Sequence, residues 1–233
     1  MMEPEPKVAQ VESNPKNELK KRWVILGAVF ALLVWGAIDL HKPHTADLRQ
    51  FNPHEVARLD NAMWRSYYAR ERLKLFLQLA ELMRTQYHFP YLKSHVVAFK
   101  AARAAFVFKD GQNRQDYERA LPYLIDFYRD IRKISRIPFN EIRTAQLELE
   151  WWIVHRERAN YGRENLEQIL AETSAELYQI PVDRMMDYAW MRAEAMTLRD
   201  TKALNGGVTE EDWNRIEELL RASWQSLWQA VNS

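Results

Sequence analysis

Residues 23–38 read WVILGAVFALLVWGAI, an unbroken run of 16 uncharged residues, and Leu40 extends the run after one acidic residue. At about 1.5 Å per residue of helix, the run covers roughly 24–27 Å, slightly less than the hydrocarbon core of a bilayer at about 30 Å. Basic side chains before it can reach the headgroups, and Trp23 and Trp35 suit the membrane interfaces. The run has no polar face, which disfavours a buried helix of a soluble domain. It therefore predicts a transmembrane anchor over residues 23–40.

A cleaved secretory signal peptide is the alternative interpretation of this run, because it also has a basic start and an apolar stretch. Its apolar stretch is usually shorter, about 7–15 residues, and a cleavage site of small residues should follow it. The nearest candidate site, Val34-Trp35-Gly36, lies inside the apolar run. We therefore expect an anchor that is not cleaved.

Basic residues are concentrated before the run. Five basic residues precede it: Lys7, Lys16, Lys20, Lys21 and Arg22. The last three adjoin the run. The positive-inside rule places such an N-terminus in the cytoplasm and the following domain outside it. We expect a single-pass protein of the inner or plasma membrane, with a periplasmic domain if the source is bacterial. Residues 1–22, with three prolines and mixed charge, are expected to form a disordered cytoplasmic tail.

The charges beyond the run balance. Of 33 Lys+Arg and 32 Asp+Glu in the chain, five and four precede the run, which leaves 28 of each sign after it. A neutral domain lacks the basic footprint of a nucleic-acid-binding protein, so no nucleic-acid partner is expected. The chain has no cysteine, which excludes disulfides, thiolate metal sites and cysteine nucleophiles.

Residues 52–233 are expected to form one all-α domain of roughly seven helices, after a linker over residues 41–51. Asn52-Pro53-His54-Glu55 is a helix start, with Asn as N-cap, Pro at the first position and Glu three residues after the cap. Pro122 lies inside the third helix, where it predicts a kink or a late start. The helices are expected at about 53–87, 90–108, 115–135, 139–161, 164–179, 181–200 and 209–233. Thr209 with Asp212 is expected to cap the last of them.

A weak internal repeat leaves the architecture open between two forms. The same spacing of apolar residues occurs twice, in Tyr117, Ala120, Leu124, Tyr128 and in Trp213, Ile216, Leu220, Trp224. Such a repeat is typical of a solenoid-like stack of helical hairpins. An ordinary amphipathic helix gives the same spacing by itself, so an irregular bundle is the other form.

The candidate site residues lie on two of the predicted helices. Glu148 and His155 share one face of helix 139–161, and Asp187 and Glu194 have similar spacing on helix 181–200. A carboxylate beside a histidine could perform acid–base chemistry or bind a metal. The structural interpretation is an ionic network at the edge of the core, whose charges are all paired.

No cofactor or metal is expected from sequence motifs. A di-iron site would need Glu-x-x-His pairs on two helices, and the sequence has none. Neither a phosphate-binding glycine-rich loop nor a Gly-x-Ser-x-Gly elbow is present. Four methionines that could suggest a soft-metal site are typical core residues: Met185, Met186, Met191 and Met196.

The leading functional hypothesis is therefore a non-enzymatic, membrane-tethered helical module that docks another protein. The alternative is an enzyme or a small-molecule or metal binder that uses Glu148, His155, Asp187 and Glu194 within a helical bundle. A pocket with convergent, buried and unpaired polar groups would favour the alternative, and a concave groove with exposed tryptophan and tyrosine side chains would favour the docking module.

Overall fold

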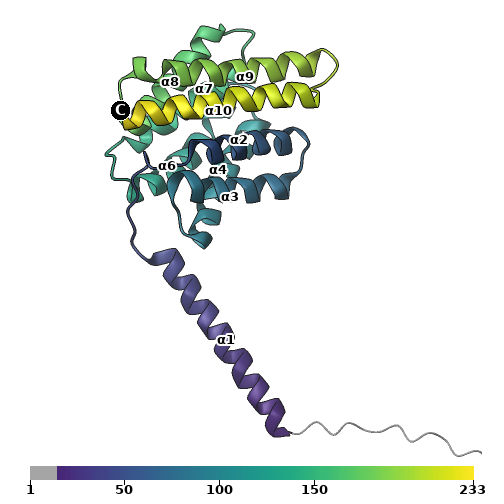
Figure 1. Cartoon of the computed structure of the whole chain (residues 1–233), viewed down its shortest axis with the longest axis vertical. Helices are drawn as coiled ribbons and strands as arrows, with labels where there is room; N and C mark the ends of the chain where they lie inside the picture. The colour runs from purple at the N-terminus through teal and green to yellow at the C-terminus, as the bar shows by residue number, and fades with distance from the viewer. Residues whose placement is uncertain (1–14) are drawn as a thin grey trace, which may run out of the picture. The chain divides into compact units, whose positions relative to one another are not determined.

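The computed structural model describes residues 15–233, and within them 80% of the chain is helical and no strand is present, which confirms the all-α class. Residues 1–14 of the expected tail lie outside the described part. The chain divides after Lys42 into two compact units (Figure 1). Each unit is considered by itself below.

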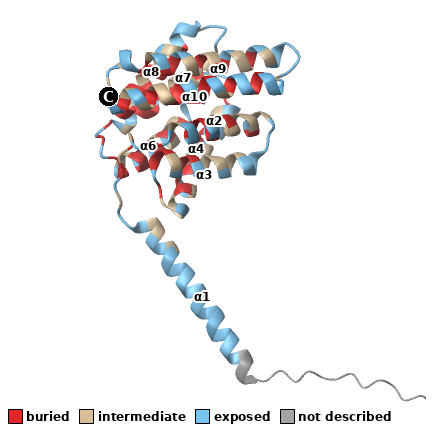
Figure 2. Ribbon diagram, in the orientation of Figure 1, coloured by how far each residue is buried: buried red, intermediate tan, exposed pale blue. Residues whose placement is uncertain are grey.

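The first unit is the apolar helix α1 (Pro15–His41), which begins before the expected start at Trp23. Residues 15–22, expected in the disordered tail, belong to this helix, since leucine, lysine and arginine are good helix formers. Its stretch Leu19–His41 contains 18 consecutive residues with a mean hydropathy of 2.2 and is long and apolar enough to cross a membrane. Most apolar residues of this stretch are exposed (Figure 2).

The second unit contains nine helices rather than seven. They are α2 (Pro53–Tyr68), α3 (Arg72–Tyr87), α4 (Tyr91–Asp110), α5 (Arg114–Glu118), α6 (Leu121–Ile134), α7 (Glu141–Arg156), α8 (Arg163–Tyr178), α9 (Met186–Leu204) and α10 (Glu210–Asn232), with a 3-10 turn η1 (Val182–Met185) before α9. The count differs because two of the expected helices are each divided in two.

The first division lies between α2 and α3, where one helix was expected over residues 53–87. Arg70 adopts a left-handed backbone with φ of 60°, and the Glu71 amide donates to the Ser66 carbonyl at 2.9 Å. This turn folds α3 back against α2, so that both helices bury apolar surface on each other. The sequence has no glycine or proline here to mark the turn.

The second division separates α5 from α6 and places Pro122 in the first turn of α6, as a late start predicts. The expected caps are confirmed. Asn52 accepts from the amides of His54 and Glu55 at 3.0 and 3.3 Å. Thr209 forms a capping box with Asp212 at the start of α10. Local sequence signals therefore determine these helix ends.

The larger helices form a closed ring. Each packs against its neighbours along the chain, in the order α2, α3, α4, α6, α7, α8, α9, α10, and α10 also packs against α2 (Figure 1). Closure between the first and last helices distinguishes this bundle from an open stack of hairpins. Fully buried side chains such as Leu124, Ile131 and Ile153 form the core.

The expected linker, residues 41–51, is largely part of the second unit. The Ala46 amide donates to the Ile134 carbonyl at 2.7 Å, and the Arg136 amide donates to the Ala46 carbonyl at 3.1 Å. Leu48 and Phe51 are buried. Apolar side chains in this segment account for the difference, because they gain by burial in the core.

This packing predicts where the second unit can be separated from α1. A chain that begins at Pro43 should be soluble and show a helical circular dichroism spectrum. A matched chain that begins at Asn52 lacks buried Leu48 and Phe51, so it should unfold more easily, by at least about 2 kcal/mol. Equal melting temperatures for the two chains would contradict this account of the linker.

Candidate functional site

Glu148 lies on α7 and is held by neutral hydrogen-bond donors. Its carboxylate accepts from the Tyr128 hydroxyl at 3.0 Å and from the Trp152 indole nitrogen at 3.0 Å. The residue as a whole keeps some accessible surface, but its carboxylate is enclosed by these partners. Burial raises the pKa of Glu148, although the hydrogen bonds and the more distant charge of Arg192 act in the opposite direction.

Four buried tyrosines belong to the same hydrophobic core, and one of them, Tyr128, donates to this carboxylate. Burial raises the pKa of Tyr87, Tyr128, Tyr178 and Tyr188, so all four remain protonated near neutral pH. The Tyr178 and Glu148 charges further raise the pKa of Tyr87. The Tyr178 hydroxyl also accepts from the Gln86 amide at 3.3 Å.

A buried ion pair joins Asp60 on α2 to Arg192 on α9. Asp60 also accepts from the Trp224 indole nitrogen on α10 at 2.9 Å, and the Arg192 guanidinium lies 5.7 and 5.6 Å from the ring centroids of Trp64 and Trp224. Burial would lower the pKa of Arg192, but the Asp60 charge outweighs it and raises that pKa. The pair thus links the three helices at which the ring closes.

We call these residues the central polar cluster: Asp60, Tyr87, Tyr128, Glu148, Tyr188 and Arg192. Asp60 and Arg192 neutralise each other. Across residues 19–233, whose side chains are described, no ion pair reaches Glu148 within 4.0 Å. Glu148 therefore does not belong to the paired ionic network that the structural interpretation expected. Neutral donors from Tyr128 and Trp152 take the place of a cation.

His155 has separate partners at the C-terminal end of α7. Its Nε2 atom lies 3.1 Å from an oxygen of Asp200, which also pairs with Arg158 and Arg199 at 3.4 and 2.8 Å. Burial would raise the pKa of Asp200, but hydrogen bonds from His155 and Arg199 outweigh it and lower that pKa. This group is a paired ionic network, as the structural interpretation expected.

The other two candidates lie elsewhere. Asp187 is exposed, and Glu194 pairs with Arg163, which also contacts Glu167 at 2.6 Å. Glu148, His155, Asp187 and Glu194 therefore share no partner and do not form one polar cluster. Among the described residues, no group of three or more His, Asp or Glu has the arrangement of a metal site.

The chemistry open to the central polar cluster is narrow. Glu148 can hold a proton, and the phenols can donate hydrogen bonds, but neither a histidine nor an activated nucleophile contributes to the cluster. Sequence reasoning found Glu148 but missed Asp60 and the tyrosines. Those residues come from α2, α3, α6 and α9, and no short motif joins them.

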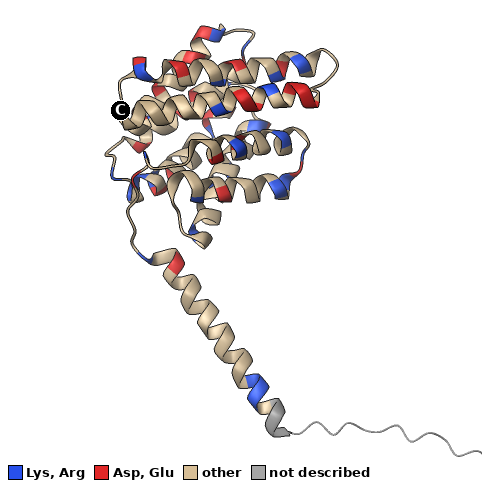
Figure 3. Cartoon of the chain, viewed as in Figure 1, with Lys and Arg blue, Asp and Glu red and all other residues tan. Residues whose placement is uncertain are grey.

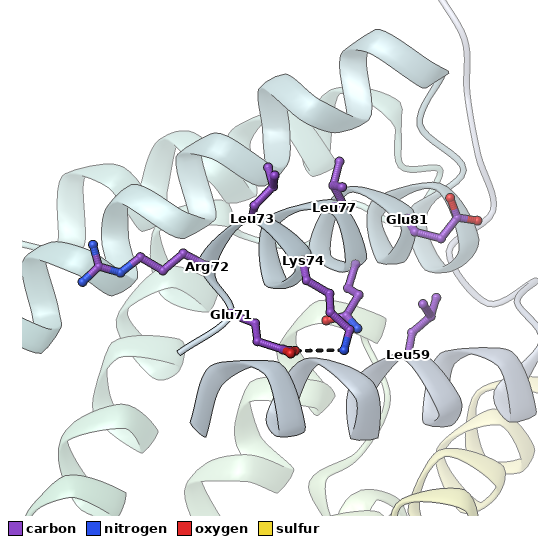
Figure 4. Close-up of a pocket in the computed structure, with 8 residues that line it drawn as sticks. Leu59, Glu71, Arg72, Leu73, Lys74, Leu77 and Glu81 are labelled. Carbon is purple, nitrogen blue, oxygen red and sulfur yellow. Dashed lines mark hydrogen bonds and ion pairs between the residues drawn. The ribbon is translucent and has the colours of Figure 1, made fainter. Parts of the chain in front are cut away.

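A second feature is a groove along α3, with Leu59 of α2 at its edge (Figure 4). It has a volume of about 650 Å³ and is lined by Leu59, Glu71, Arg72, Leu73, Lys74, Leu77, Gln78 and Glu81. Leu73 and Leu77 are 73% and 51% exposed. Lys74 pairs with Glu71 at 2.8 Å beside them. The groove thus offers apolar side chains to solvent next to a mixed set of charges.

Comparison with models of protein families, with curated proteins and with solved structures found no match to this chain.

Proposed function

We propose that this protein is a membrane-tethered helical module that docks another protein, rather than an enzyme. The observation that carries the proposal is the groove along α3, where Leu73 and Leu77 are exposed. Exposed apolar side chains rimmed by polar ones are typical of protein-interaction sites.

The partner that best fits this groove is an amphipathic helix. Leu73 and Leu77 are one helical turn apart and project from the same face of α3, so they can receive apolar side chains at positions i and i+4 of a partner. Glu71, Lys74 and Glu81 at the rim can set its orientation through charge.

A photo-cross-linking residue in place of Leu77 tests this docking in intact cells. It should give a discrete cross-linked product, and Leu73→Glu should weaken that product by at least about tenfold, equivalent to about 1.4 kcal/mol of binding. The matched control is the same cross-linker in place of Leu204, which is 77% exposed and lies outside the groove. Identical products from Leu77 and Leu204 would contradict the docking proposal.

The proposed topology puts the N-terminus in the cytoplasm and the helical domain outside it, in the inner or plasma membrane. Its support is the basic group before the apolar stretch, with Lys20, Lys21 and Arg22 at one end of α1 and Asp39 at the other (Figure 3). In a bacterium the domain is then periplasmic.

A reporter enzyme that is active only outside the cytoplasm, fused after Ser233, should be active in this topology. The matched control is the same fusion in a chain whose basic residues Lys20, Lys21 and Arg22 are replaced by glutamate, which should reduce the activity because the orientation signal is removed. Activity confined to a cytoplasmic reporter would overturn both the orientation and the location.

The central polar cluster supports a second candidate function, binding of a small molecule. Its specific support is Glu148, a carboxyl with a raised pKa and no ion pair in the described structure, because perturbed titration is frequent at functional sites. Of the four candidate residues from the sequence, only Glu148 would contribute to this small-molecule site.

A further inference from the structure

Exposed apolar side chains are concentrated on two helices of the second unit. Residues 43–233 have ten exposed large apolar side chains, and six of them lie on α3 and α4. Two of the six, Leu73 and Leu77, line the groove described above. The other four lie on α4: Tyr91, Val96, Phe99 and Phe106.

Three of these side chains form a stripe along α4, which we call the α4 face: Val96, Phe99 and Phe106. Spacings of three and seven residues place them on one side of the helix. The opposite side carries buried Val97, Ala98 and Ala104 and packs on the domain. The outward side of a soluble helix is ordinarily polar, so a stripe with two phenylalanines there indicates an apolar environment.

The charge around this stripe is positive. α4 contains four Lys+Arg and one Asp+Glu, and one of the four cations, Lys100, pairs with Asp130 of α6. Arg103 and Lys109 lie on α4 itself and are exposed. A basic surface around apolar side chains suits an anionic partner.

The connection to α1 is short. α1 ends at His41, and Ala46 is fixed to the domain by backbone hydrogen bonds, so these two residues are at most about 18 Å apart along an extended chain. The His44 ring lies 6.1 Å from that of Phe89, which is in the turn between α3 and α4. The chain therefore reaches the domain beside the start of α4.

We propose that the α4 face lies on an anionic lipid surface of the membrane that α1 spans. The inference rests on the proposed membrane anchoring of α1. Phe99 and Phe106 enter the boundary between headgroups and acyl chains, and Arg103 and Lys109 bind lipid phosphates. The short connection holds the surface within reach of the bilayer, so even a weak affinity for lipid is sufficient to keep it there.

Spin labels on the whole 233-residue chain test this contact, since the chain has no cysteine. Phe99→Cys and Phe106→Cys are labelled with a nitroxide and placed in vesicles of phosphatidylcholine with phosphatidylglycerol. In these vesicles the accessibility of the nitroxide to lipid-soluble oxygen, relative to its accessibility to a water-soluble nickel chelate, should be several-fold higher than in detergent. It should rise less in phosphatidylcholine alone, because the basic side chains then have no anionic lipid to bind.

Two control labels distinguish failure of the lipid contact from failure of the membrane anchoring. A label at Val29→Cys reports whether α1 is in the bilayer, and one at Leu204→Cys reports an exposed position outside the α4 face. Labels at Phe99 and Phe106 that resemble the one at Leu204, while Val29 is in lipid, would overturn the inference and leave the anchoring intact. Shielding from both reagents would indicate contact with another protein copy and would also overturn it. A water-exposed Val29 would refute the anchoring, and the inference with it.

Discussion

Replacement of Arg192 by methionine should lower the free energy of unfolding by about 3–5 kcal/mol, because it leaves Asp60 as a buried charge without its partner. Asp60 is 4% exposed and cannot regain water without opening the contact between α2 and α10. For a unit of this size the melting temperature should fall by about 6–20 °C. Thermal unfolding followed by circular dichroism measures this change.

A double variant separates the charge effect from loss of packing. Asp60→Asn with Arg192→Met removes both charges and keeps an oxygen that can accept from the Trp224 indole, so it should recover more than half of the loss. The matched control is Arg58→Met on α2, the helix that carries Asp60. Arg58 forms an exposed pair with Glu55 at 3.0 Å, which should contribute at most about 1 kcal/mol. A stability of Arg192→Met within 1 kcal/mol of the control would contradict the role of this pair in closing the ring.

Helix ends were predicted well where a local residue determines them. Asn52 and Thr209 accept from amides a few residues away, and Pro122 fits the first turn of a helix without losing a hydrogen bond, so these effects are local. The turn at Arg70 was missed for the opposite reason. A left-handed arginine has no sequence signal, and the packing of α3 on α2 stabilises it.

Ring closure and the central polar cluster depend on residues far apart in the chain. Asp60 and Trp224 are 164 residues apart and hydrogen-bond each other. Periodicity identifies the face on which each residue lies but not the helix that face meets. Glu148 could be singled out because it borders an apolar face of α7, whereas its contact with Tyr128 could only come from the three-dimensional structure.

The structural and functional interpretations predict different results for variants of Glu148. Glu148→Ala removes the acceptor for both the Tyr128 hydroxyl and the Trp152 indole, so it should cost about 1–3 kcal/mol for each buried donor left without a partner. Glu150→Gln is the matched control on the same helix. Glu150 pairs with Arg114 near the surface and should contribute at most about 1 kcal/mol.

Glu148→Gln should instead change how stability depends on pH. The pKa of Glu148 is raised in the folded state above its ordinary value of 4.5, so the folded protein binds the proton more tightly than the unfolded chain does. The stabilisation from that proton is fully present below pH 4.5 and is lost as pH rises through the folded pKa. The glutamine variant stays neutral and lacks this loss, so its stability relative to the wild type should increase over that interval.

The measurement is the free energy of unfolding from denaturant titrations between about pH 4 and pH 8, for the wild type, Glu148→Gln and Glu150→Gln. Parallel pH profiles for the wild type and Glu148→Gln would contradict the raised pKa of the Glu148 carboxyl that its burial leads us to expect. A small molecule bound by the wild type and lost in Glu148→Gln, with little change in stability, would favour the small-molecule function. Glutamine keeps the shape of the side chain and removes only its charge, so loss of binding would identify that charge as the group the ligand recognises.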